Sequence, residues 1–241
     1  AAISEPAACE ANPILSQALN VTFPASLAAA AEAVSARFIH ISSEQVFDGA
    51  NAPYRIGDPP SPINLYGRQK VESEKLVLSA SKNAAVVRAP LLLGNSLSGK
   101  RSVHEKLLEV WSGGSAARFY VDEFRQACTA GNLAAALLEI AARPELRGVF
   151  HWAGAELCSR YELGQRLAAR FGVPPALVIS VRRAETPAVS AKRPANLALD
   201  LAPLNQELRL QPQTLDEALE ELVVPVHFKE WPRKMISPPQ P

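Results

Sequence analysis

Tyr66 and Lys70 lie four residues apart, in the segment Tyr66-Gly67-Arg68-Gln69-Lys70. Side chains four apart on a helix share one face, so the Tyr66 hydroxyl and the Lys70 ammonium can enter the same cleft. Carbonyl reduction needs such a pair, because a phenol protonates the carbonyl oxygen and a nearby cation lowers the pKa of that phenol. The spacing therefore predicts Tyr66 as a general acid assisted by Lys70. An ordinary surface helix with an i, i+4 pair is the alternative.

Ser43 ends a short apolar segment, residues 37–43, that precedes this pair. The segment is typical of a buried parallel strand, and parallel sheets place their sites at the carboxyl ends of their strands. We expect Ser43 to hydrogen-bond a substrate carbonyl beside Tyr66, although a serine can also bond its own turn. Glu44 follows directly and has two interpretations, a contact to a sugar hydroxyl or a solvated loop carboxylate.

Strand and helix patterns alternate along the chain. Apolar segments predict strands at 37–43, 84–93, 117–121, 148–152 and 178–181. Helical patterns are found at 13–36 (with a kink at Pro24), 64–81, 102–111, 132–142, 160–171 and 214–222. This alternation predicts an α/β fold with a Rossmann-like parallel sheet. The last third is proline-rich and less periodic, so we expect a sheet domain over residues 1–153 and a smaller substrate lobe over 154–241.

One segment suggests a different chemistry. Residues 94–100 read Gly-x-x-x-x-Gly-Lys and follow an apolar strand, as phosphate-binding loops of nucleotide triphosphatases do. The next residue is Arg101, where such loops need a Ser or Thr hydroxyl for magnesium. A polar loop near the substrate lobe is the preferred interpretation.

The bulk composition limits the partners. A formal charge of +1 without basic runs argues against binding to nucleic acid. The three cysteines (Cys9, Cys128 and Cys158) and four histidines show no metal-ligand spacing, so we expect no metal site and no disulfide framework. A reducing, cytoplasmic location fits best. No apolar run is expected to reach the length of a membrane span.

Several blocks together resemble one family. Residues 38–49, 53–55, 62–70, 87–90, 148–154, 159–162 and 193–200 follow one another as in the extended short-chain dehydrogenase/reductases. Within that superfamily they are most similar to dTDP-4-dehydrorhamnose reductases and to the regulatory β subunit of methionine adenosyltransferase. The resemblance extends to about residue 210.

The resemblance implies NADP(H) or NAD(H) as cofactor and a nucleotide-linked 4-keto sugar as substrate. Tyr66 would be the acid, Lys70 would also hold the nicotinamide ribose, and Ser43 would bind the carbonyl. The cofactor would additionally lie against Ala1, Ala2 and Pro90. The sugar would lie near Ser43, Glu44 and Leu91.

Two departures from the family leave two functions open. No Gly-x-x-Gly-x-x-Gly turn is present, so roughly 60 residues of the family fold, including the usual dinucleotide phosphate site, are expected to be missing ahead of Ala1. Gln45 and Leu91 stand where the reductases carry aromatic residues. On the resemblance as a whole, the chain is predicted to be a reductase of nucleotide-linked 4-keto sugars. The alternative is a non-catalytic NADP-binding regulatory subunit, with a homodimer or a partner subunit as the expected assembly.

Overall fold

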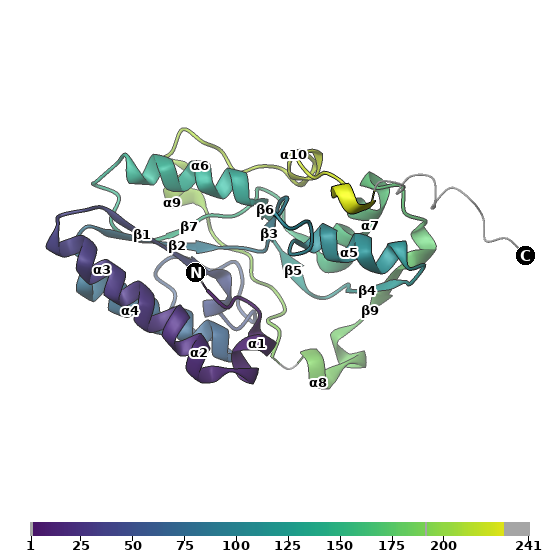
Figure 1. Cartoon of the computed structure of the whole chain (residues 1–241), viewed down its shortest axis with the longest axis horizontal. Coiled ribbons are helices and arrows are strands. Elements are labelled where there is room, and N and C mark those ends of the chain that lie inside the picture. The colour runs from purple at the N-terminus through teal and green to yellow at the C-terminus, as the bar shows by residue number, and fades with distance from the viewer. Residues whose placement is uncertain (1, 191, 229–241) are drawn as a thin grey trace, which may run out of the picture.

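The computed structural model describes residues 2–190 and 192–228. Figure 1 shows an elongated molecule with a helix-covered parallel sheet at one end and a smaller lobe at the other. The α/β fold predicted from the sequence is confirmed. Ala1, one of the residues expected at the cofactor, lies outside the described residues.

The main sheet has three parallel strands in the order β1-β2-β7. They are β1 (Phe38–Ser43), β2 (Ala84–Ala89) and β7 (Gly148–His151). Strand β2 is buried at every position, because it has a strand on each side and helices on both faces. Strand β1 pairs with β2 alone among the described residues, so it forms an edge of this sheet.

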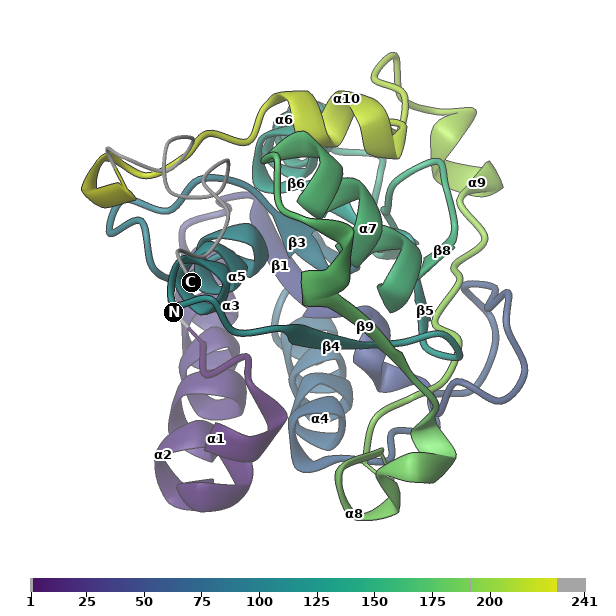
Figure 2. The ribbon, with the colours of Figure 1, turned by 90° about the vertical axis from the view of Figure 1, so that its right-hand side faces the viewer.

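Helices cover both faces of the sheet. Helices α3 (Phe23–Ala33) and α4 (Leu65–Ala80) pack on one face, and α6 (Ala130–Ala141) packs on the other with α9 (Ala202–Asn205) beside it (Figures 1 and 2). Since α4 carries both Tyr66 and Lys70, its seat on β1 and β2 sets the position of the candidate chemistry.

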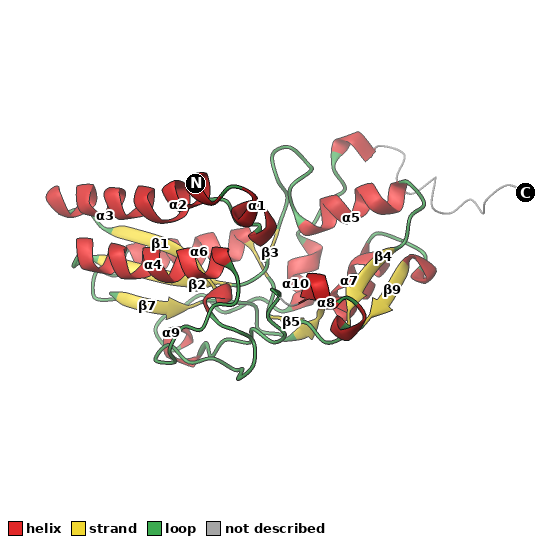
Figure 3. Ribbon diagram, turned by 90° about the horizontal axis from the view of Figure 1, so that it is seen from below, coloured by secondary structure: helices red, strands yellow, loops and turns green. Residues whose placement is uncertain are grey.

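The smaller lobe is built around a second parallel pair, β4 (Ala117–Tyr120) with β9 (Val178–Val181). Helices α5 (Val103–Ser112), α7 (Arg160–Arg170) and α10 (Leu215–Glu220) surround it (Figure 3). The core of this lobe joins Trp111 and Phe119 to Leu167 and Leu222. It thus draws on both sides of the expected boundary at 153/154, which stays a prediction.

Two-residue strands link the two ends of the molecule. Strand β3 (Leu92–Leu93) pairs with β6 (Cys128–Thr129), and β5 (Phe124–Arg125) pairs antiparallel with β8 (Cys158–Ser159). The remaining short elements are α1 (Pro6–Ala11), α2 (Pro13–Gln17), α8 (Pro187–Ser190), η1 (Ala18–Thr22), η2 (Glu44–Val46), η3 (Pro175–Leu177), η4 (Arg183–Glu185) and η5 (Val226–Phe228).

Proline explains two differences from the predicted elements. The strand expected over 84–93 is divided into β2 and β3, because Pro90 has no backbone N–H to continue the ladder. The helix expected over 13–36 is a continuous run of α2, a π-helical turn (η1) and α3. Pro24 lies at the start of α3 and has no N–H to donate to the preceding turn, and the irregular turn lies just before it.

The helical run Pro13–Ala33 is long and apolar enough, by length and composition alone, to cross a membrane. The expectation that no segment reaches that length is therefore wrong for these residues. Core helices of soluble proteins and signal sequences meet the same criterion, so this property carries no membrane assignment. In the structure the run packs along α4.

A buried ion pair fastens α4 to the sheet. Arg88 on β2 donates from Nε and Nη2 to the two carboxylate oxygens of Glu74 on α4, at 3.0 and 2.8 Å. Ser42 on β1 donates to the same carboxylate. Both ionic side chains are at most 5% exposed, so neither has water as an alternative partner.

We expect Glu74→Ala to lower the free energy of unfolding by about 3–5 kcal/mol, because it leaves the Arg88 guanidinium buried and unpaired. Urea denaturation measures the loss. Glu72→Ala is the matched control on the same helix, since Glu72 is exposed and its change is expected to stay within about 0.5 kcal/mol. Equal losses in the two variants would contradict this role for the ion pair.

Candidate active site

The amino end of α4 is fixed tightly against the loop that follows β1. Asn64 caps the helix, its Oδ1 accepting from Gly67 N at 2.8 Å, and its amide donates to Gln45 Oε1 at 2.8 Å. A Cβ on Gly67 would lie 2.1 Å from the carbonyl oxygen of Gln45, so only glycine permits this approach. Residue 66 is thereby held next to the end of β1.

Ser43 and Tyr66 meet at this point. Both side chains are buried, and the Ser43 hydroxyl acts to lower the pKa of Tyr66. Ser43 Oγ accepts from Gln45 N at 3.2 Å, so the bond to its own turn is present. The structure therefore brings together the two hydroxyls that the sequence predicts at one carbonyl.

Lys70 is buried one turn further along α4. Its Nζ donates to the carbonyl oxygen of Ile41 at 2.7 Å and lies 3.3 Å from Nε2 of His40. Burial lowers the pKa of Lys70 to about 8, against the opposing charge of Glu74. Two of the three ammonium hydrogens have partners, which leaves one for a ligand hydroxyl.

The electrostatics of Tyr66 differ from the expectation. Burial raises the pKa of Tyr66 to about 12, and the hydrogen bond from Ser43 only partly opposes this. Lys70, whose ammonium is bonded to the Ile41 carbonyl, contributes no lowering of the Tyr66 pKa in this arrangement. With this raised pKa, Tyr66 is protonated at neutral pH and can act as a proton donor.

The remaining predicted site residues surround this centre. Glu44 is buried and pairs with Arg125, with 3.2 Å between its Oε1 and the arginine Nε, so it is not a solvated loop carboxylate. Pro90 is buried directly after β2, Leu91 is half-buried against the core of the smaller lobe, and Ala2 is exposed. Their contacts with cofactor or substrate stay predictions.

Sequence reasoning missed the charged residues around Glu44, namely Glu123, Arg125, Arg160 and Arg193. Each lies far from Glu44 in sequence, and β5 is too short to show a pattern. The one available signal was the alternation of Glu123 and Arg125, since residues two apart on an extended segment share a side. His40 also lies at this site, with its Nε2 2.9 Å from Ser73 Oγ and 3.3 Å from Lys70 Nζ.

The loop at residues 94–100 already holds an anion of its own. The carboxylate of Glu105 accepts hydrogen bonds from the backbone N–H groups of Ser96, Arg101 and Ser102 at 2.7–2.9 Å. The pKa of Glu105 falls to about 2 because these bonds, with one from the Ser96 hydroxyl, outweigh the effect of burial. Since the amides that would cradle a phosphate are occupied, the loop is not a nucleotide triphosphate site.

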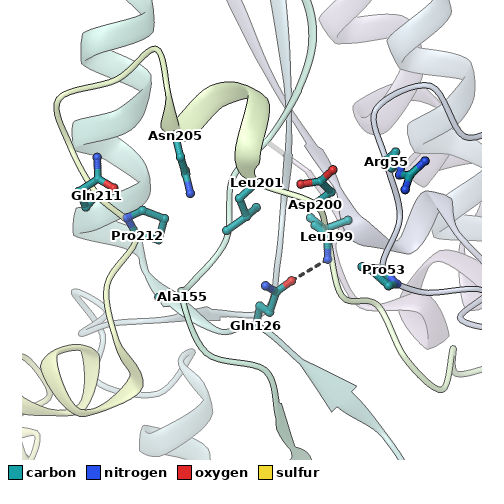
Figure 4. Close-up of a pocket in the computed structure, with 10 residues that line it drawn as sticks. All are labelled: Pro53, Arg55, Gln126, Ala155, Leu199, Asp200, Leu201, Asn205, Gln211 and Pro212. Carbon is teal, nitrogen blue, oxygen red and sulfur yellow. Dashed lines mark hydrogen bonds between the residues drawn. The ribbon is translucent and has the colours of Figure 1, made fainter.

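A cavity of about 560 Å³ lies elsewhere, between the loop that contains Arg55 and the segment from Leu199 to Pro212 (Figure 4). Gln126, whose Oε1 accepts from Leu199 N at 2.6 Å, forms part of its wall. Its lining includes none of Ser43, Tyr66 and Lys70. We therefore place the candidate chemistry at the Ser43–Tyr66 pair and not in this cavity.

Comparison with known proteins agrees with this geometry. The family model of the RmlD substrate binding domain matches residues 1–227. The chain belongs to this family. The methionine adenosyltransferase 2 subunit beta of Bos taurus is 34% identical over 209 residues, 85% of this chain and 62% of that protein. The probable low-salt glycan biosynthesis reductase Agl14 of Haloferax volcanii is 29% identical over 92% of this chain and 74% of its own length.

Solved structures share the fold of this RmlD-family chain. The dTDP-4-dehydrorhamnose reductase of Bacillus anthracis, in complex with NADP, superposes with a TM-score of 0.81 at 21% identity, over 91% of this chain and 75% of that one. A hypothetical dTDP-4-dehydrorhamnose reductase of Sulfolobus tokodaii gives 0.78 at 25% identity, over 93% and 77%. The chain spans 62% of the length of the Bos taurus relative.

The raised pKa of Glu44 predicts a pH dependence of stability. Burial raises it from the usual 4.5 to about 7, against the charges of Arg125 and Arg160. When the pKa of an acid is higher in the folded state than in the unfolded state, its contribution to stability is present below the unfolded-state pKa. That contribution is lost as the pH rises through the folded-state pKa. Relative to Glu44→Gln, the wild-type free energy of unfolding should therefore fall as the pH rises from about 5 to about 8.

Glu123→Gln is the control for this measurement. Although burial acts to raise it, the pKa of Glu123 is held below its usual value by the hydrogen bond from Arg193 and nearby arginine charges. Its contribution to stability should be constant across the same pH range, because the group stays ionised there. Urea denaturation at several pH values measures both variants, and a flat difference for Glu44→Gln would contradict the assignment.

Proposed function

We propose that this site carries out the NAD(P)H-dependent reduction of a nucleotide-linked 4-keto sugar, as an extended short-chain dehydrogenase/reductase. The observation that carries the proposal is the buried Ser43–Tyr66 pair at the carboxyl end of a parallel strand, with Lys70 one turn away on α4. Two solved proteins of the same fold are named dTDP-4-dehydrorhamnose reductases, which supports the substrate class.

The site fits a nicotinamide cofactor at its ribose end. Lys70 has one ammonium hydrogen left for a ribose hydroxyl, and Pro90 and the segment at Ala2 would border the ring. The sequence offers no Gly-x-x-Gly-x-x-Gly turn for the pyrophosphate. When bound, the reduced nicotinamide supplies the hydride that reaches the carbonyl carbon of the sugar.

The chain's own residues handle the proton. Ser43 donates a hydrogen bond to the substrate carbonyl oxygen, and Tyr66 transfers its hydroxyl proton to that oxygen as negative charge develops there. A phenol with a pKa of about 12 is a weak acid, so a ligand that draws Lys70 away from the Ile41 carbonyl toward Tyr66 would strengthen it. Lys70 thus acts on the reaction through Tyr66.

A second function is favoured by the relative from Bos taurus. It is named a methionine adenosyltransferase subunit, so the same fold could bind NADP(H) without turnover and dock on another subunit of such a transferase. Turnover of 4-keto sugars supports the reductase function. Co-purification with a methionine adenosyltransferase in the absence of turnover supports the regulatory function.

Tyr66→Phe is expected to lower turnover of a nucleotide-linked 4-keto sugar by about 10²–10⁴-fold, because the general acid is lost while the ring remains packed. The rate is followed by NADPH absorbance. Tyr161→Phe, a half-buried tyrosine on α7, is the matched control and should keep the wild-type rate. Near-normal turnover by Tyr66→Phe would remove Tyr66 from the reaction.

Lys70→Ala is expected to weaken NADPH binding by about tenfold or more, because a charge-assisted hydrogen bond to the ribose is lost. NADPH fluorescence on titration with the protein reports the dissociation constant. The exposed Lys75 on the same helix provides the control, and Lys75→Ala should bind as the wild type does. Equal affinity in all three proteins would contradict the assignment of Lys70 to the ribose.

A further inference from the structure

Five ionisable side chains converge next to the Ser43–Tyr66 pair. They are Glu44, Glu123, Arg125, Arg160 and Arg193, and we refer to them as the arginine–glutamate cluster. Glu44 follows Ser43 directly in η2, Arg125 lies on β5, and Arg160 begins α7. The cluster therefore lies where the sheet and the smaller lobe meet, beside the candidate catalytic hydroxyls.

The two carboxylates are already shared among two of the arginines. Arg193 donates from Nε and Nη2 to both oxygens of Glu123, each at 2.8 Å. Arg125 forms two ion pairs. Its Nη2 lies 3.2 Å from Oε1 of Glu123, and its Nε lies 3.2 Å from Oε1 of Glu44. Arg125 also donates to backbone carbonyls, including that of Pro194 at 3.0 Å, which holds it in place.

The Arg160 side chain takes part in none of the contacts just described. Its Nη1 is enclosed by protein yet has no hydrogen-bond partner among residues 2–190 and 192–228, and the same is true of Glu44 Oε2. Burial lowers the pKa of Arg160 to about 10, although the nearby carboxylates oppose this. An enclosed guanidinium hydrogen without an acceptor is costly, so the arrangement is incomplete unless something else supplies that acceptor.

The net charge of the arginine–glutamate cluster indicates which kind of ligand would bind there. Three guanidinium groups face two carboxylates, a net charge of +1 in a cluster in which Glu44, Glu123 and Arg125 are buried and Arg160 and Arg193 are partly exposed. The count rises when Glu44 takes up a proton, which its raised pKa favours near neutral pH. A ligand with one negative charge would balance the cluster, and the planar fork of a guanidinium matches a planar carboxylate.

We propose that Arg160 binds a carboxylate carried by the sugar of the substrate, so that this site prefers an acidic nucleotide-linked sugar to its neutral counterpart. The inference rests on the proposed function, because it places the sugar carbonyl at Ser43 and Tyr66. We place the anionic group on the sugar itself, because Glu44 belongs to the cluster and is the next residue after Ser43, which we assign to the sugar carbonyl. An enclosed water molecule on Arg160 is the competing explanation.

A matched pair of ligands tests this. UDP-glucuronate and UDP-glucose differ only in a carboxylate against a hydroxymethyl group, and calorimetric titration of the full chain in the presence of NADP⁺ gives both dissociation constants. We expect the wild type to bind the acid about tenfold or more tightly than the neutral sugar, the worth of a charge-assisted hydrogen bond. Arg160→Gln should lose this preference, and Arg160→Lys should retain part of it because the charge remains.

Arg166→Gln is the control on the same helix. Arg166 pairs with Glu156 and Asp216 in a more exposed position, so this change should leave the preference intact. Thermal unfolding of each variant shows whether it is folded. If Arg160→Gln does not fold, the inference is tested by the preference of the wild type for the acidic ligand and by the reduced preference expected of Arg160→Lys.

The outcomes separate the two proposals. Equal binding of the two ligands by the wild type overturns this inference, points to enclosed water on Arg160, and leaves the proposed reductase function standing. A preference that survives in folded Arg160→Gln also overturns the assignment to Arg160. Binding of neither sugar nucleotide also overturns this inference, whereas the proposed function is decided separately by turnover of a nucleotide-linked 4-keto sugar.

Discussion

The ion pair between Glu74 and Arg88 is the constraint on which the rest of this site depends. Tyr66, Lys70 and Glu74 recur every four residues on α4, so one face of the helix carries the acid, the cation and the fastening carboxylate. Because Glu74 is bonded to the central strand, the two groups before it are directed to the end of β1. The close approach of Gly67 to Gln45 fixes the same helix at its other end.

The molecule contains two buried clusters of charge, and the contrast between them is informative. Around Glu74, both carboxylate oxygens are taken and the Arg88 guanidinium also lies 5.0 Å from the Phe47 ring, so the group is complete without a ligand. Around Glu44, one carboxylate oxygen and one guanidinium nitrogen are enclosed without partners among the described residues. Three other enclosed atoms are also unpartnered, including Nδ1 of His151, whose Nε2 lies 3.3 Å from Arg88. Buried polar groups are normally satisfied, and the donor left on Arg160 is the one that the proposed ligand would bind.

The sequence predicted what depends on local patterns and failed where distant segments meet. The four-residue spacing of Tyr66 and Lys70, the apolar strand ending at Ser43 and the Asn64 cap are local, and the structure places them as expected. The break of the second strand at Pro90 was missed, although proline has the chemistry to cause it. The bond from Lys70 to the Ile41 carbonyl could not be predicted, because spacing gives the face of a helix and not the partner on the sheet. Arg125, Arg160 and Arg193 were out of reach for the same reason, since their meeting with Glu44 requires the whole chain to be folded.

The unpaired edge of β1 affects how binding and stability of this protein should be measured. Among the described residues β1 has a neighbour on one side only, and Ile41 on this strand is 45% exposed. An unpaired strand edge is a template for hydrogen bonds from another chain. Pairing of two molecules through their β1 edges would grow with protein concentration whether or not any ligand is bound. Titrations and denaturation curves are best recorded at more than one protein concentration, so that pairing of edges is separated from binding at the site.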